Sequence, residues 1–160
     1  MSLNTMKYSR SVEIKEDSEI VTVQYTIPPN LPLYTIPESP IAWARAVPTR
    51  THGMWDSQKK LKLYLGLFIE RAHGNLPLLE GPLLLDIKFC MPMTQQMLKE
   101  PRKWEGSWHS HRPDLDNLTK LILDTCNTIL FEDDKSVSAV MATRVYSKSP
   151  RTEFRLMELK

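Results

Sequence analysis

Two segments with helical periodicity, each followed by a segment with the pattern of a strand, constrain the fold of this chain most. Apolar residues recur three and four apart in 56–73 and 116–131, whereas 81–93, 136–147 and 151–159 are apolar or β-branched runs. A helix with one apolar face has to bury that face against another element. The alternation therefore predicts an α+β (mixed α/β) domain, with a mixed sheet of about four or five strands and two main helices packed on it.

Local signals predict where these elements begin and end. Asp56 or Ser57 is suited to cap the first helix, and Gly74-Asn75 is suited to end it. The last two strands are joined by 148–150, which we expect to form a hairpin turn. The apolar face of the second helix is expected to consist of Leu118, Leu121, Ile122, Thr125 and Ile129.

The amino-terminal third is less regular. Residues 1–18 are polar and are expected to form a flexible segment, and 19–160 a single domain. The run EIVTVQYTI (19–27) predicts a strand. Residues 28–48 hold six of the twelve prolines, so we expect loops there with one short extended piece, IAWARAV (41–47).

Composition indicates an ordinary globular protein. The chain has 160 residues, 41% of them apolar and 25% charged. No apolar run approaches the roughly 18 residues of a membrane span, and the first residues lack the apolar core of a signal peptide. We therefore expect a cytoplasmic protein with no membrane partner. Cys90 and Cys126 lie in apolar patterns, which favours two buried free thiols over a disulfide.

Charge is distributed unevenly although the net charge is only +2. Residues 114–134 carry six acidic residues against Lys120, whereas 41–63 carry five basic residues against Asp56. Residues 135–160 carry six basic residues and two glutamates. Basic flanks suit a polyanion, and a clustered acidic island suits a hard cation. A solvated surface with random charge patches explains the same numbers equally well.

The acidic island begins in the stretch RPDLDNLTK (112–120). Pro113 restricts the residue before it, so Asp114 and Asp116 can point into one small volume at the start of a helix. Asp133-Asp134 follow one helix length later, about 20 Å away along the axis. This pair can reach the first two aspartates only through a strand that runs back beside the helix, or from a partner chain.

Such a set suits phosphodiester hydrolysis. Carboxylates hold Mg²⁺ or Mn²⁺, which neutralise phosphate charge and activate water, and a lysine such as Lys120 stabilises the charge that develops. Simpler explanations stand beside this one. Asp114 can be a helix cap, Asp116 and Lys120 a surface ion pair, and Asp133-Asp134 a turn.

The polar loop 94–112 contains two tryptophans among basic residues. Trp104 and Trp108 can stack on bases, or they can fold the loop back onto the core. His109 and His111 are better placed to face solvent or phosphate than to bind a metal. Asp124 is on the polar side of the second helix, where we expect a structural role or one that supports the metal ligands.

The segment HRPDLDNLTKLILDTCNTILFEDDKSV (111–137) resembles the signature of the RusA family of Holliday junction resolvases. That signature is a basic residue, Pro or another residue, and then D-x-D-N-L-x-K. A helix containing Asp follows, and then an acidic pair followed by a polar residue and Val. The positions that match are Asp114, Asp116, Asn117, Leu118, Lys120, Asp124, Asp133, Asp134 and Val137. A weaker similarity extends over about residues 20–159. The loop 94–112 departs from the compact bacterial members by its length.

This resemblance implies a homodimeric, Mg²⁺-dependent endodeoxyribonuclease that binds four-way DNA junctions and nicks two opposing strands in recombination and repair, with Mn²⁺ able to substitute. It implies a bacterial or prophage-encoded protein. Asp114, Asp116 and Asp134 are the implied metal ligands, Asp133 is the alternative to Asp134, and Lys120 is the essential lysine. Asn117 and Asp124 are expected to support them. The residues expected to contact DNA are Arg45, Arg50, Lys59, Lys60, Lys103, Trp104, Trp108 and Arg112.

Two other functions remain open. If the protein is a module that binds branched DNA with little catalysis, the wild type never cuts with Mg²⁺ or Mn²⁺, and variants with asparagine in place of aspartate bind more tightly. A flap or fork endonuclease of the same fold would cut those substrates in preference to junctions.

Overall fold

The computed structural model describes residues 15–16, 19–20, 27–28, 30–48 and 54–159. The chain divides into two compact units, residues 1–31 and 32–160. In the first unit, β1 (Lys15–Glu16) and β2 (Glu19–Ile20) pair antiparallel. The predicted strand 19–27 therefore begins as expected, whereas 21–26 and most of the predicted flexible segment lie outside the described residues.

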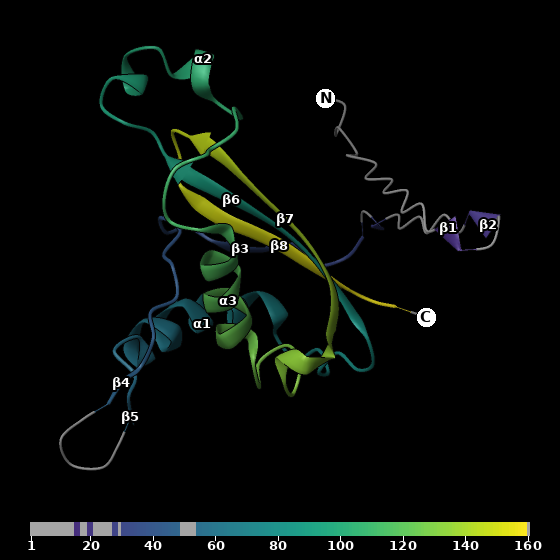
Figure 1. The fold of residues 1–160 in the computed structure, drawn as a ribbon. Helices are drawn as coiled ribbons and strands as arrows, with labels where there is room; N and C mark the ends of the chain where they lie inside the picture. The colour runs from purple at the N-terminus through teal and green to yellow at the C-terminus, as the bar shows by residue number, and fades with distance from the viewer. Residues whose placement is uncertain (1–14, 17–18, 21–26, 29, 49–53, 160) are drawn as a thin grey trace. The chain divides into compact units, whose positions relative to one another are not determined.

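A four-stranded mixed sheet organises the second unit (Figure 1). Its strands, in spatial order, are β3 (Tyr34–Ile36), β8 (Arg151–Glu158), β6 (Leu83–Pro92) and β7 (Val137–Ser147). Strand β6 runs parallel to β7 and antiparallel to β8. The predicted α+β fold with a mixed sheet is confirmed.

The predicted hairpin between the last two strands is wrong. β7 and β8 flank β6 on opposite sides, so residues 148–150 cross the end of the central strand. The physical reason is that β6 is the strand with apolar residues on both faces. Leu85 and Ile87 face the core, and Leu84 and Cys90, on the other face, are also at most 2% exposed. Such a strand belongs in the middle of a sheet.

Two helices cover one face of the sheet, α1 (Lys59–His73) and α3 (Leu115–Cys126). Leu65 and Ile69 of α1 and Leu118, Leu121 and Ile122 of α3 form one core with the odd-numbered residues of β6. Ile129, expected on the apolar face of the second helix, lies just beyond the end of α3. The largest fully buried side chains include Phe89, Phe131, Phe154, Ile69, Leu118 and Leu121.

The N-cap of α1 lies one residue after Ser57 and two after Asp56, the two predicted caps. Gln58 occupies the N-cap position without a side-chain cap bond, and Asp56 Oδ1 accepts a hydrogen bond from the Gln58 N–H at 2.9 Å. Asp56 thus organises the turn just before the helix. Gly74 ends α1 with a φ of 60°, a conformation that glycine adopts without steric cost.

Helix α3 ends five residues before the predicted end. Thr128 adopts a φ of 65°, and its N–H donates to the carbonyl of Phe131 at 2.7 Å. Leu130 and Phe131 are fully buried although they are no longer helical. The apolar pattern therefore continues through a buried turn, which periodicity cannot distinguish from a helix.

The proline-rich stretch contains a strand that was not expected, β3, because Tyr34 and Ile36 alternate into the core. Residues 41–46 have no regular structure, and only Val47 of the predicted extended piece is in a strand, β4 (Val47–Pro48), which pairs with β5 (Met54–Trp55). The loop 94–112 contains η1 (Met97–Lys99) and a short helix, α2 (Pro101–Trp104).

Two expectations from composition can be compared with the structure. Cys90 and Cys126 are free and buried, as predicted. No helix in the described part of the chain has the length and apolar character needed to cross a membrane.

Candidate active site

Asp114 and Asp116 lie at the amino end of α3 with exposed side chains. Asp114 occupies the N-cap position in an extended conformation, but its side chain makes no cap hydrogen bond. Among the described residues, neither carboxylate takes part in an ion pair or a side-chain hydrogen bond. Both carboxylates are therefore available to a ligand, and the simple explanation of Asp114 as a helix cap is not supported by its geometry.

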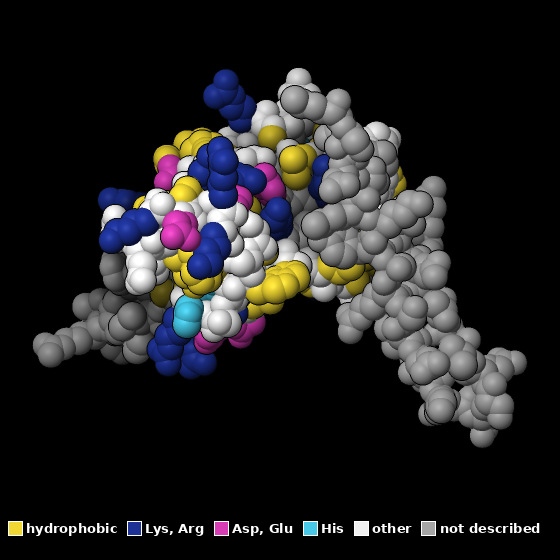
Figure 2. Space-filling model, turned by 90° about the horizontal axis from the view of Figure 1, so that it is seen from above, with side chains coloured by type: hydrophobic (Ala, Val, Ile, Leu, Met, Phe, Trp, Pro, Cys, Tyr) yellow, Lys and Arg dark blue, Asp and Glu magenta, His cyan; other side chains and the backbone are white. Residues whose placement is uncertain are grey.

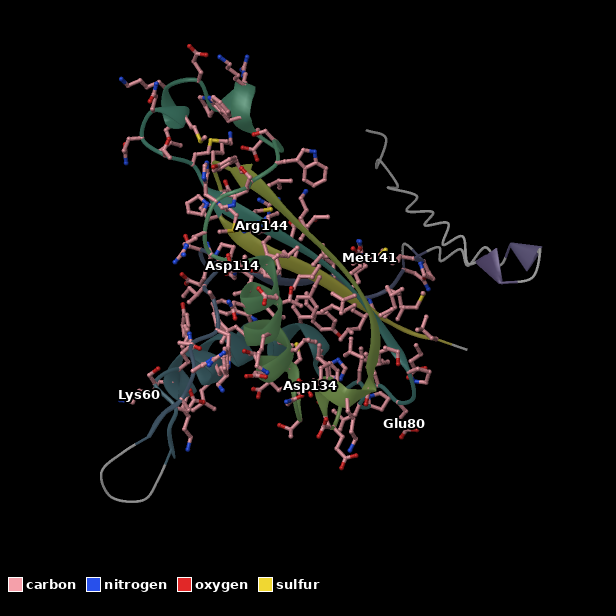
Figure 3. The ribbon with its side chains drawn as sticks, in the orientation of Figure 1. Lys60, Glu80, Asp114, Asp134, Met141 and Arg144 are labelled. Atoms are coloured by element: carbon pink, nitrogen blue, oxygen red, sulfur yellow. The ribbon has the colours of Figure 1, made fainter. Side chains whose placement is uncertain are left out.

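Arg144 on β7 holds the backbone that leads to Asp114. Its Nη1 donates to the carbonyl of His111 at 2.8 Å and also to the carbonyl of Pro113. These bonds connect the edge strand β7 to the entry of α3 (Figure 3). Arg144 was not singled out from the sequence, because an arginine in a strand carries no signal that it binds distant carbonyls.

Lys120 lies one turn further along α3 than Asp116, and its side chain has two neighbours, Asp124 and Trp43. Its Nζ lies 3.5 Å from Asp124 Oδ1 and 5.1 Å from the centre of the Trp43 ring. The expected alternative, a pair between Asp116 and Lys120, is absent among the described ion pairs. Asp124 also lies 3.9 Å from Lys62, which pairs with Asp56 at 2.6 Å. A chain of alternating charges thus links α3 to α1.

Trp43 is a second residue that sequence reasoning missed. The backbone N–H of Trp43 donates to the Asn117 carbonyl at 2.9 Å. The next residue, Ala44, donates to Gln58 Oε1 at 2.7 Å, and Gln58 Nε2 returns a bond to the carbonyl of Ala42 at 2.8 Å. This irregular segment is therefore fixed between the two helices. The sequence shows only an aromatic residue in a basic, proline-rich stretch. That signal is too weak to identify a site residue.

Asp134 lies at the opposite end of α3 from Asp114 (Figure 3). It begins the short helix η2 (Asp134–Ser136), and Asp133 caps that helix by accepting a hydrogen bond from the N–H of Lys135 at 2.9 Å. No three acidic, histidine or cysteine side chains gather into a metal-binding group within the described residues. One chain places Asp114 and Asp116 two residues apart at the start of α3, and the acidic pair follows the other end of that helix.

The residues present fit a divalent cation of the magnesium type. Mg²⁺ is commonly held by only one or two protein carboxylates, with water and substrate phosphates completing its octahedron. Asp114 and Asp116 supply two unpaired carboxylates on one helix turn, and the positive end of the helix dipole lies beside them. Neither a histidine nor a cysteine needs to take part.

The residues predicted to contact DNA occupy separate parts of the surface. Arg45, Lys59 and Lys60 are exposed near the start of α1, and Arg112 is exposed just before Asp114. Arg50 lies outside the described residues. Lys103 is exposed on α2, where its Nζ lies 5.7 Å from the Trp104 ring.

The second half of loop 94–112 is attached to the outer edge of β7. Tyr146 exchanges backbone hydrogen bonds of 2.9 Å with Gly106 and Ser107, and the His109 N–H donates to the Arg144 carbonyl at 3.1 Å. Trp108 remains 73% exposed. Figure 2 shows several Lys and Arg side chains on the face that carries this loop, interspersed with acidic ones.

His109 is packed against Tyr146, with ring centres 4.7 Å apart. Burial lowers the pKa of His109, and the nearby charges of Arg144 and His111 lower it further. The imidazole is therefore harder to protonate than that of a free histidine. This arrangement suits a structural role better than contact with phosphate.

Comparison with known proteins gives two findings. A family model described as "Endodeoxyribonuclease RusA" matches residues 37–157. A protein from Bacillus subtilis (strain 168), named "Uncharacterized protein YqaN", is 27% identical over 106 residues, which cover 63% of this chain and 74% of that protein. The region that the family model matches contains α1, α3, β6, β7, all of β8 except its last residue, and every residue of the candidate site, whereas β3 lies before it.

Proposed function

Because the chain belongs to the RusA endodeoxyribonuclease family, we propose that it is a structure-selective endonuclease that resolves four-way DNA junctions by paired symmetric nicks. The observation that carries this proposal is the pair of exposed, unpaired carboxylates at the start of α3, with Lys120 one turn away. We assign it a role in DNA recombination and repair as a cytoplasmic protein that is bacterial or prophage-encoded.

Asp114 and Asp116 would hold Mg²⁺, or Mn²⁺ in its place. Such a cation would supply positive charge to the scissile phosphate and would make a bound water easier to deprotonate for hydrolysis. The protein contributes a fixed backbone segment just before Asp114. Arg144 bonds to two carbonyls just before Asp114, so the backbone that leads to Asp114 is held in place.

Lys120 stabilises negative charge on the phosphate as it develops during hydrolysis. The ring of Trp43 and the carboxylate of Asp124 hold the ammonium group of Lys120 in position. Asp124 and Asn117 act on the site indirectly, the first through Lys120 and the second through its backbone bond to Trp43.

DNA is held by its backbone charge. Arg45, Lys59, Lys60 and Arg112 are exposed on the elements that flank the aspartates, and Lys103, Trp104 and Trp108 extend the surface along loop 94–112. Contacts of this kind bind phosphates without reading sequence, which suits an enzyme that recognises the shape of a junction.

A homodimer is part of the proposal for two reasons. A four-way junction has two-fold symmetry, so two symmetric nicks need two active sites. Within one chain Asp134 is separated from Asp114 by the length of α3. We therefore assign the third carboxylate of each site to Asp134 of a partner chain, with Asp133 as the alternative.

The test is cleavage of a synthetic mobile four-way junction by the wild type and by Asp116→Asn, in Mg²⁺ and in EDTA. Forked, flapped and linear duplexes are run at the same concentration. The proposal expects symmetric nicks in the junction that require Mg²⁺ and are lost in the variant while binding survives.

Other outcomes would lead elsewhere. Activity that persists in EDTA contradicts metal dependence. Preferential cutting of forks or flaps makes the protein a related endonuclease of different selectivity. Tight binding of junctions without cleavage in either metal makes it a DNA-binding module.

A further inference from the structure

We propose that the exposed edge of β7 is the surface on which a second copy of this chain pairs, strand to strand and antiparallel, with the two-fold axis at Met141. This inference rests on the homodimer of the proposed function and specifies its interface. The pairing joins two four-stranded sheets into one sheet across the dimer.

Strand β7 lies at the edge of the sheet, and its edge is only half covered. The segment 106–109 covers Arg144 to Tyr146 through the bonds already described. At the other end, a bulge at Ser138 interrupts the register between β6 and β7. Between these two features, residues 139–143 make no backbone hydrogen bond on the outer side with any residue that the structure describes.

Residues 139–143 have the properties of an edge strand that pairs with another strand, rather than those of an edge that is protected against such pairing. Their sequence, AVMAT, contains neither charge nor proline, and Val140 is 42% exposed. Exposed edges in monomeric proteins are usually blunted by charged residues, prolines or bulges, because free N–H and C=O groups invite another strand. The bulge at Ser138 lies outside this run.

The pattern of hydrogen bonds sets the register. Arg144 and Tyr146 bond outward to 107–109, so the even-numbered residues of this strand direct their N–H and C=O groups away from β6. Val140 and Ala142 therefore present free groups. An antiparallel pair centred on Met141 places Val140 opposite Ala142 of the partner, and each such pair exchanges two hydrogen bonds.

This register is self-consistent at both ends. The next outward residue, Arg144, already uses its carbonyl for His109, so pairing with the partner stops where segment 106–109 begins. No like charges face each other within the run.

Antiparallel pairing also directs the amino end of the partner's β7, and with it the partner's Asp134, toward the Arg144 end of this strand. That is the end at which Arg144 holds the approach to Asp114.

The test is the oligomeric state by sedimentation equilibrium, without DNA or metal. In the proposed register the two Val140 side chains are diagonal neighbours, about 7–8 Å apart. Val140→Lys and Val140→Glu should each raise the dimer dissociation constant at least about tenfold. An equimolar mixture of the two should restore the dimer, because opposite charges then face each other. Val140→Thr and Leu67→Lys, the latter on the exposed side of α1, should remain dimeric like the wild type.

A monomeric wild type, or charge variants that remain as dimeric as the wild type, would overturn the interface. So would folded, monomeric variants that the mixture does not restore. If the charge variants do not fold by circular dichroism, Ala142→Pro asks the same question, because it removes one outward N–H without adding charge; a dimeric Ala142→Pro would overturn the proposal. None of these readouts involves cleavage, so an inactive dimer would refute the nuclease and leave the interface standing.

Discussion

The Asp116 side chain is exposed and makes no ion pair or side-chain hydrogen bond with the described residues, so it does not stabilise the fold through them. We predict that Asp116→Asn leaves the melting temperature within about 1–2 °C of the wild type, because surface changes away from contacts usually alter stability by less than about 0.5 kcal/mol. Metal-dependent cleavage should be lost and junction binding in EDTA should tighten, because a negative charge near phosphate is removed. A calorimetric melt and a binding titration measure the two effects. A large loss of stability would show that the carboxylate has a structural partner.

Lys120 is the residue whose environment the structure explains best. Removing a donor that stabilises developing charge typically costs about 10²–10³ in rate, and we expect a loss of that size for Lys120→Met in single-turnover cleavage. Trp43→Phe should retain most of the rate, because an aromatic face remains, whereas Trp43→Leu should lower it. If Trp43→Leu cleaves like the wild type, the ring does not position the ammonium group.

His109 should make stability depend on pH. Its pKa lies below the ordinary value of 6.5, so the unfolded chain binds a proton more readily than the folded chain. The stabilisation is therefore fully present above about pH 6.5 and is lost progressively as the pH falls from there through the folded pKa. We predict that the free energy of unfolding falls less steeply between pH 7 and 5 in His109→Gln than in the wild type. Identical slopes in the two proteins would contradict the burial argument.

At the level of elements, the packing of α1 depends on Gly66. A Cβ at this position would lie 3.1 Å from Cδ1 of Ile129, the residue just beyond the end of α3. Gly66→Leu should therefore destabilise the fold by about 1–3 kcal/mol through overpacking. Combining it with Ile129→Ala should recover part of that loss in urea unfolding. Additive losses in the double variant would show that the two positions do not share the space.

The sequence predicted elements best where burial follows a regular period. Helices α1 and α3 bury residues three and four apart and β8 buries every second residue, so these three elements were expected. Strands β6 and β7 were expected from their apolar or β-branched runs instead. The order of strands was not expected, since 148–150 look like a turn and their actual role depends on β6 taking the centre. The end of α3 and strand β3 were also misjudged, because tertiary burial of 130–131 and of Tyr34 overrides local pattern.

The candidate site divides in the same way. Asp114, Asp116 and Lys120 lie within one segment of the chain, so their spacing was enough to place them on one helix end. Trp43 and Arg144 reach that end from distant segments through backbone contacts, which no local pattern encodes. Assignment to the RusA family, first indicated by the resemblance of 111–137, is confirmed by the match over 37–157.

For the whole molecule, DNA binding should depend steeply on salt, because the proposed contacts are to phosphates. Lys59→Gln combined with Lys60→Gln should weaken junction and duplex binding alike and reduce the salt slope by about two. Arg71→Gln, an exposed change in the last turn of the same helix, serves as the control and should leave the slope nearly unchanged. Equal slopes for the double variant and the wild type would remove the start of α1 from the DNA surface.

The central claim is that each active site combines Asp114 and Asp116 of one chain with Asp134 of another. The most direct measurement is junction cleavage by a mixed dimer of Asp116→Asn and Asp134→Asn, obtained by co-expression with two different tags. Each variant alone should be inactive. The mixed dimer contains one site in which all three aspartates are intact, so we predict that it nicks one strand of the junction in Mg²⁺. A mixed dimer as inactive as its parents, beside an active wild type, would contradict the account.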